Sequence, residues 1–260
     1  MSDESQIGIA ESAGPGPAVA TRQQPVAPAW HTILFILILL GLSFYQYHSA
    51  AEARLAQASS LLPTYIFTVI YELVLLGYVY FLGMRRRNVT ISEIVAGKWD
   101  RWGQFWLDVG IALLFWLVVD VVLAILSLEL GFSGIKAAQS LLPRTGIEMV
   151  VWVALSCCAG FCEEVVFRGY LQRQFVSWTG NVIAAVTLQA IVFGAAHLYQ
   201  GVKAVFVISI YGALFGSLAA IRKSLRPGIM QHAGQDSVSG ILGHFVTKLP
   251  QFQHLQMLRF

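Results

Sequence analysis

Apolar residues come in long blocks along the chain from about residue 31 onward, and short polar stretches separate these blocks. A helix needs roughly twenty mostly apolar residues to cross a bilayer. The blocks therefore predict an all-α fold, a polytopic transmembrane helix bundle with about seven spans, eight being the alternative count. The predicted spans cover about residues 31–47, 62–84, 105–130, 145–175, 181–197, 202–221 and 228–246.

The composition agrees with lipid contact and argues against a soluble protein. Hydrophobic residues make up 57% of the chain and charged residues 12%, which is about half the charged fraction of soluble domains. Charged side chains cost on the order of a few kcal/mol at the centre of a bilayer, and this cost explains their scarcity. The net charge of +3 is small and scattered. It predicts no nucleic-acid partner and fits cationic loops that lie against the lipid bilayer.

Four regions follow from this pattern. Residues 1–29 are rich in Pro, Gly, Ala, Ser and Gln and have no apolar block, so they predict a disordered tail. Residues 30–130 hold the first three spans, which we interpret as accessory. Residues 145–247 hold the remaining four spans, and residues 248–260 form a short C-terminal tail.

The most basic loop predicts the orientation of the chain. Residues 85–87, Lys98 and Arg101 lie between the second and third spans. Loops rich in Lys and Arg face the cytoplasm, so we expect this loop and the N-terminal tail on the cytoplasmic side.

Ionisable residues inside the spans are costly in lipid and are therefore candidates for function. They gather in the second half of the chain, in three strings: EEVVFRGYLQ from Glu163, FGAAH ending at His197 and HAGQD from His232. Glu72 and Asp120 stand alone in their spans, and we interpret them as polar contacts that face the bundle.

Helix geometry distinguishes the two glutamates of the first string. At about 100° per residue, Arg168 lies roughly 40° from Glu164 but about 140° from Glu163. Arg168 is therefore expected to neutralise Glu164 in the favourable i to i+4 order. Glu163 has no partner nearby in the sequence, so it is the carboxylate available to exchange a proton with water.

The depth of the histidine string is a difficulty. If residues 181–197 crossed the whole membrane, His197 would lie near the face opposite to Glu163 and His232. A tilted or re-entrant segment would remove the difficulty, and so would a site that lies deeper than the predicted boundaries imply.

Two chemical hypotheses and one structural alternative fit these residues. Neutral His197 and His232 could bind zinc, with Asp236 as a further ligand or as a partner that orients His232. Alternatively, the histidines could donate hydrogen bonds to the oxyanion of a tetrahedral intermediate without a metal. In both cases Glu163 activates the water that attacks a peptide carbonyl. The structural alternative is a buried salt bridge and two hydrogen-bonded histidines that only hold the bundle together.

Taken together, the three strings resemble the CPBP family of intramembrane metalloproteases, which comprises CAAX prenyl endopeptidases and bacteriocin-processing or immunity proteins of the Abi type. The family pattern is a double glutamate with an arginine four residues after the second. It continues with FxxxH and a further histidine motif, each on a transmembrane helix. The resemblance covers residues 145–247 and implies that this region is the catalytic core.

The resemblance also implies roles for the individual residues. Glu163 would be the water-activating base, with Glu164 and Arg168 as its support. The family often has asparagine where this chain has Asp236, and a carboxylate there favours a metal because it can ligate the ion or raise the basicity of a ligating histidine. By the same resemblance His197 and His232 would be either oxyanion donors or zinc ligands, the ligand set for zinc being His197, His232 and Asp236.

The implied activity is that of a CAAX-like metalloendopeptidase with a protein or peptide substrate delivered from the membrane. The compact size of the chain predicts a bacterial member in the inner membrane. An immunity protein or another peptide-binding membrane protein without catalysis is the alternative from a different class. A transporter is a weaker third option, because the chain shows no two-fold internal repeat.

Overall fold

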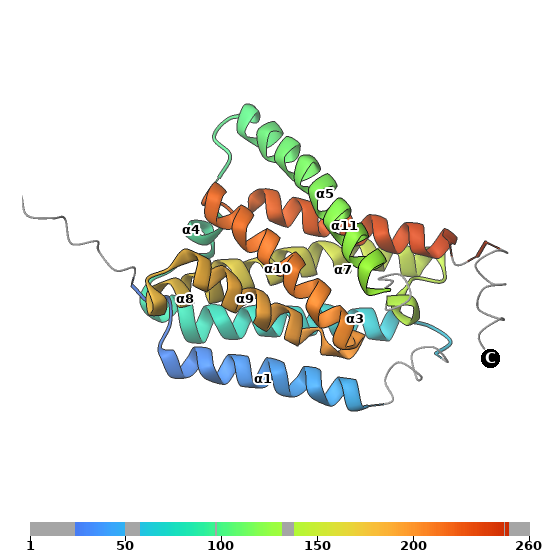
Figure 1. Ribbon diagram of the computed structural model, residues 1–260, viewed down its shortest axis with the longest axis horizontal. Coiled ribbons are helices and arrows are strands. Elements are labelled where there is room, and N and C mark those ends of the chain that lie inside the picture. Colours follow the sequence, from blue (N-terminus) through green and yellow to red (C-terminus); the bar gives the residue numbers. More distant parts are fainter. Residues whose placement is uncertain (1–23, 50–57, 97, 132–137, 247, 250–260) are drawn as a thin grey trace, which may run out of the picture.

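The computed structural model describes residues 24–49, 58–96, 98–131, 138–246 and 248–249. These ranges contain helices, turns and short loops but no strand, so the predicted all-α fold is confirmed (Figure 1). The α-helices are α1 (Ala29–His48), α3 (Leu62–Gly77), α4 (Ile91–Val95), α5 (Trp102–Leu130), α7 (Gly146–Glu163), α8 (Gln172–Thr179), α9 (Val182–Ala196), α10 (Val202–Arg222) and α11 (Arg226–Val246). The shorter π- and 3-10 segments are η1 (Tyr78–Gly83), η2 (Met84–Arg87), η3 (Gln139–Leu141), η4 (Glu164–Leu171) and η5 (Leu198–Gln200).

The helices correspond closely to the predicted spans. Within the described ranges, five helical segments are long and apolar enough to cross a membrane. Two of the seven predicted spans do not meet this criterion of length and hydropathy. The helix α9 is apolar but has only 15 residues, and α11, with 21 residues, carries the polar HAGQD string. The chain is therefore a multi-pass membrane protein whose second half contains the less regular helices.

The central element is one continuous helix made of α7, η4 and α8, which together run over Gly146–Thr179, 34 residues. It begins with a capping box, in which the Thr145 hydroxyl accepts from the backbone N–H of Glu148 and the Glu148 side chain accepts from that of Thr145. It ends at Gly180, whose φ of +66° favours glycine. The side chain of Asn181 then caps α9, so the chain turns back sharply.

This turn answers the question of the depth of His197. Glu163 lies sixteen residues before Thr179, and His197 lies fifteen residues after Val182. At 1.5 Å per residue both are therefore about 22–24 Å from the turn. The two antiparallel helices thus bring Glu163 and His197 to similar distances from the turn, which removes the difficulty.

Small residues allow α9 and α10 to pack closely. A Cβ atom on Gly212 of α10 would come within 3.2 Å of Ala190 Cα in α9. On Gly194 of α9 it would overlap the carbonyl oxygen of Val205 in α10. Glycine at these positions therefore allows the close contact of the two helices.

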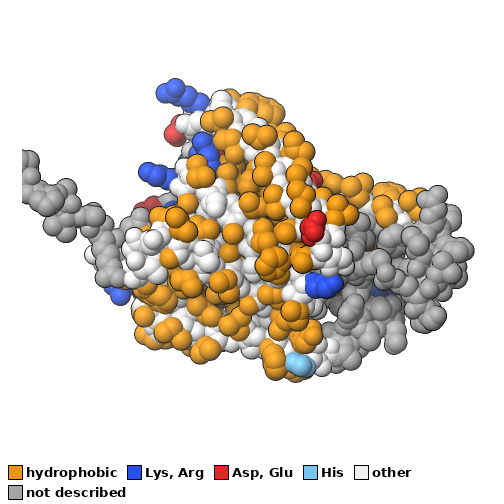
Figure 2. All heavy atoms as spheres, in the orientation of Figure 1, with side chains coloured by type: hydrophobic (Ala, Val, Ile, Leu, Met, Phe, Trp, Pro, Cys, Tyr) orange, Lys and Arg blue, Asp and Glu red, His pale blue; other side chains and the backbone are white. Residues whose placement is uncertain are grey.

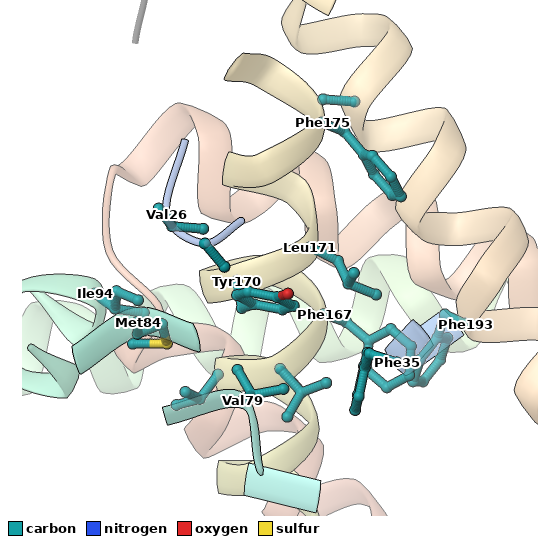
Figure 3. Close-up of a cluster of buried hydrophobic side chains, with 14 of the residues drawn as sticks. Val26, Phe35, Val79, Met84, Ile94, Phe167, Tyr170, Leu171, Phe175 and Phe193 are labelled. Atoms are coloured by element: carbon teal, nitrogen blue, oxygen red, sulfur yellow. The ribbon is translucent and has the colours of Figure 1, made fainter. Parts of the chain in front are cut away.

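The principal buried apolar cluster surrounds η4 and includes the segment that precedes α1 (Figure 3). Val26 and Ala27 are buried in it. The backbone N–H of Ala27 donates to Gln174 Oε1 at 3.1 Å, and Gln174 Nε2 donates to the Ala27 carbonyl at 2.9 Å. Residues 24–28 are thus packed against the bundle, although the disordered tail was predicted to reach residue 29. The rest of that predicted tail, and residues 250–260 of the C-terminal one, lie outside the described residues.

The long helix α5 crosses the outside of the bundle at an angle and contacts α10 and α11 (Figure 1). Near its start, Asp108 forms ion pairs with Arg222 at 3.4 Å and Arg226 at 3.0 Å. Figure 2 shows hydrophobic side chains over most of this face, with Lys and Arg gathered toward the end where α4 and the start of α5 lie. Trp102 and Trp106 are exposed at that end, as expected for headgroup-level aromatics.

Candidate active site

The double glutamate lies where the central helix changes its winding. Glu163 is the last residue of α7, and Glu164 begins the π-helical segment η4, all of whose residues are buried. Such π segments within α-helices are frequent at functional sites. Arg168 Nη1 lies 2.9 Å from Glu164 Oε1. The predicted i to i+4 ion pair is therefore confirmed.

Arg168 is held on all sides by the protein. Its guanidinium carbon lies 4.4 Å from the ring centroid of Phe193 and 5.1 Å from that of Phe215. Its Nη2 atom is 3.5 Å from the carbonyl oxygen of Gly212. The ion pair and the two aromatic faces compensate a charge that would otherwise be very costly in this position.

His232 of α11 meets the same carboxylate from the other side. Its Nδ1 atom lies 3.2 Å from Glu164 Oε1, which Arg168 also contacts. Because the carboxylate paired with Arg168 can only accept, His232 Nδ1 carries the proton of this hydrogen bond. Glu164 thus links the arginine of η4 to the histidine of α11 and fixes the orientation of the imidazole ring.

The second nitrogen of His232 faces two more carboxylates. Nε2 is 3.8 Å from Glu163 Oε2 and 3.6 Å from Asp236 Oδ2, in both cases without a hydrogen bond. Glu163 Oε2 is buried and has no hydrogen-bond partner among the described residues. A buried polar atom without a partner costs free energy, so its presence calls for an explanation.

His197, at the end of α9, is oriented by its own helix. Its Nδ1 atom lies 2.8 Å from the carbonyl oxygen of Phe193, so Nδ1 is the donor and Nε2 is the free nitrogen. The ring also packs against Phe193, with a centroid distance of 4.8 Å. The charges of His197 and Asp236 are close enough to interact.

The structure adds a residue that sequence reasoning did not place in the site. Glu72 of α3 is buried, and its charge interacts with those of Glu163 and His232. The sequence signal was the presence of a carboxylate within a span, which we interpreted only as a polar contact facing the bundle. Glu72 does face the bundle, and its neighbours there include Glu163 and His232.

The histidines individually suit a metal, but the set as arranged does not form a metal site. In their neutral forms, with the proton on Nδ1, His197 and His232 would both present an Nε2 lone pair. In the described part of the chain, however, no group of three or more His, Cys, Asp or Glu side chains is placed to hold a metal ion. The side chains present therefore do not fit the implied zinc ion.

The close approach of α7 and α11 creates the contact between Glu164 and His232. A Cβ atom on Gly160 would lie 2.7 Å from the backbone nitrogen of Ala233, which cannot move independently of α11. Gly160→Ala is therefore expected to push the two helices apart. Since a displacement of about 1 Å can cost a hundredfold in rate, we expect a loss of peptidase activity of about that size.

The matched control is Gly41→Ala in α1, where an added Cβ meets nothing within 4 Å. Peptidase activity of both variants would be measured in lipid nanodiscs, with thermal unfolding as the check on folding. Equal activity of Gly160→Ala and Gly41→Ala would contradict the importance of this helix contact.

Fold and site together define the class of protein: a multi-pass membrane protein with a buried Glu–Arg–His cluster at the meeting point of the helices η4, α9 and α11. Residues 145–238, about a third of the chain, match the family model described as Type II CAAX prenyl endopeptidase Rce1-like. The matched segment begins at the cap of α7 and extends past Asp236, so the resemblance inferred from the three strings is confirmed there. The match supports a CAAX-type protease acting on a peptide or protein in the membrane. Neither the comparison with curated proteins nor that with solved structures found a match.

Proposed function

We propose that this chain is an intramembrane endopeptidase in which Glu163 activates the attacking water. The observation that carries the proposal is the pair formed by Glu163 Oε2, which is buried without a hydrogen bond in the described part of the chain, and His232 Nε2, 3.8 Å away. One atom is a base and the other is a hydrogen-bond donor when the imidazole is protonated. The family match supports this assignment, because its printed description is that of an endopeptidase.

In the first step Glu163 acts as general base. Its carboxylate takes a proton from water while the water oxygen bonds to the carbonyl carbon of the substrate. The electron pair of the carbonyl π bond moves to the oxygen, which becomes an oxyanion.

His232 is placed to stabilise that oxyanion. Its ring lies 3.2 Å from Glu164, 3.8 Å from Glu163 and 3.6 Å from Asp236. Three carboxylates around one imidazole favour its protonated form. The Nε2–H of this imidazolium can then donate a hydrogen bond to the developing negative charge.

In the second step the tetrahedral intermediate collapses. The carbonyl double bond forms again, the C–N bond breaks, and the proton held by Glu163 passes to the leaving amine nitrogen. Glu164 and Arg168 keep His232 in position throughout. The products are a carboxylic acid, which loses its proton to water, and an amine, and the enzyme returns to its starting state.

This sequence of steps uses no metal ion, and its dependence on metal is directly measurable. We expect the purified chain to keep its activity after treatment with a strong zinc chelator, because the side chains as arranged do not form a three-ligand group. Mass spectrometry would measure the metal content of the wild type and of a double variant, His197→Ala with His232→Ala. One zinc per chain that disappears in the double variant, together with activity lost on chelation, would contradict the metal-free scheme.

The proposal also includes the orientation of the chain in the membrane and the kind of membrane that holds it. The basic residues of the segments on either side of α4 share one end of the bundle with Arg222 and Arg226, which contact Asp108 and the Lys98 carbonyl. We infer that this end, with the segment before α1, faces the cytoplasm of a bacterial inner membrane.

The activity is tested with a peptide rather than with a protein of known identity. The probe is a farnesylated peptide that ends in a CAAX box, beside the same peptide without the lipid, added to the chain in nanodiscs. The proposal expects two fragments from at least one of these peptides, with the cut inside the chain of the peptide. An intact peptide that binds to the folded chain would instead support the non-catalytic, peptide-binding alternative.

A further inference from the structure

A row of polar side chains runs from α11 to the middle of α5, beside the catalytic cluster. Asp120 Oδ1 accepts a hydrogen bond from Gln235 Nε2 at 3.1 Å. Gln235 Oε1 in turn accepts from Gln231 Nε2, one helical turn earlier. We call these three residues, Asp120, Gln235 and Gln231, the polar row.

Both ends of the polar row have acceptor capacity that the protein does not use. Asp120 is exposed, although it lies near the middle of an apolar helix of 29 residues. A carboxylate at that depth is expensive unless water or a cation accompanies it. At the other end, Gln231 is 1% exposed and its Oε1 has no hydrogen-bond partner within the described ranges. Asp120 accepts hydrogen bonds from Gln235 and Trp116, but among the described residues it forms no ion pair, so the row lacks positive charge.

The polar row is adjacent to the residues of the proposed reaction. Gln231 and Gln235 directly precede His232 and Asp236, so each pair differs by about 100° around α11. The helix α11 thus turns one face to the glutamates of the central helix and the neighbouring face to α5. The second face packs on α5, since a Cβ added at Gly234 would be in van der Waals contact with the Trp116 ring at 3.4 Å.

The charges around the site favour the same kind of ligand as the polar row. The carboxylates of Glu163, Glu164 and Asp236 surround His232, and Glu164 is also paired with Arg168. With Asp120 added on the α5 side, carboxylates outnumber cations. A substrate that brings a positive charge would thus be attracted to this region.

We propose that the polar row is a binding site for substrate, and that it selects a polypeptide with a lysine or arginine close to the bond that is cut. Asp120 pairs with the cationic side chain, and Gln235, which donates to Asp120, holds the carboxylate in place. This inference deepens the proposed function and rests on it. It assigns the α5–α11 face a role in specificity, whereas Glu163 and His232 act on the bond itself.

The test compares binding of two kinds of fluorescent peptide that partition into membranes. One is a neutral peptide, and the others carry a single lysine moved stepwise along the same sequence. Dissociation constants are measured in nanodiscs with Asp120 intact and with Asp120→Asn, both in a Glu163→Gln background that prevents cleavage. Asparagine retains an oxygen that can accept from Gln235, so the change removes the charge and keeps the tie between the helices.

We expect the best lysine peptide to bind about tenfold more tightly than the neutral one, as one charge-assisted contact predicts. In Asp120→Asn this ratio should fall close to one. The matched control is Glu129→Gln, which removes an exposed carboxylate from the end of the same helix and should keep the ratio. A ratio of one with Asp120 intact, or an unchanged ratio in Asp120→Asn, would overturn the proposal.

The outcome also separates this inference from the proposed function. Suppose that the enzyme with Glu163 intact cleaves peptide, but that the ratio of the dissociation constants does not depend on Asp120. This result would refute the polar row as a binding site and would still support the peptidase. A lysine preference that depends on Asp120, with no cleavage of any peptide, would support the binding site and refute the proposed peptidase activity.

Discussion

Glu163→Gln is expected to reduce the turnover number for peptide cleavage by about a thousandfold, within the range that general-base catalysis contributes. The amide has almost the shape of the carboxylate but cannot take a proton from water. Since Glu163 Oε2 has no hydrogen bond to lose among the described residues, the change should leave the fold intact. The measurement is the turnover number in nanodiscs, with the thermal unfolding curve recorded on the same preparation.

The control for this prediction is Glu129→Gln, an equal change of charge far along the chain from the double glutamate. It should cleave at the rate of the wild type. A Glu163→Gln variant that is folded and fully active would show that another group activates the water.

Arg168→Met is expected to lower the free energy of unfolding by about 3–5 kcal/mol, the usual cost of removing one partner from a buried ion pair. Methionine fills part of the space between Phe193 and Phe215 but leaves the buried charge of Glu164 without its 2.9 Å partner. Peptidase activity should fall as well, because Glu164 orients His232. Unfolding would be followed by denaturant titration in detergent micelles.

The matched variant for this second prediction is Arg168→Met combined with Glu164→Gln. The double variant has no unpaired charge, so we expect it to be more stable than Arg168→Met alone. Additive losses in the double variant, or wild-type stability of Arg168→Met, would show that the ion pair is not important for the fold.

The parts of this molecule that depend on local spacing were predictable from the sequence. Apolar blocks of sufficient length predict helices in lipid wherever they occur, and α1, α5 and α10 begin and end within a few residues of the predicted spans. The pairing of Glu164 with Arg168 follows from the periodicity of one helix, and the π-helical winding of η4 did not disturb it.

Contacts between distant segments were not predictable in the same way. His232 approaches Glu164 across 68 residues of sequence, and no periodicity indicates which nitrogen of the ring faces which carboxylate. Glu72 looked isolated because its neighbours in the site belong to other helices. The depth of His197 was ambiguous because it depends on where the central helix ends, at Gly180.

The segment before α1 shows that amino-acid composition alone does not predict whether a segment is ordered. Its prolines and small residues are typical of a disordered chain, yet Ala27 is buried and both its backbone groups bond to the amide of Gln174. A single side chain 147 residues away satisfies this backbone. Composition alone carries no information about such a partner.

The most direct test of the central claim is the mass of the products formed from a cleavable peptide in water enriched with oxygen-18. Hydrolysis by water at Glu163 predicts two fragments with the wild-type chain, the new carboxylate carrying one heavy oxygen, and intact peptide with Glu163→Gln. Fragments formed equally fast by folded Glu163→Gln, or a peptide that stays bound and uncut on the wild type, would contradict the claim that this membrane bundle is a glutamate-dependent peptidase.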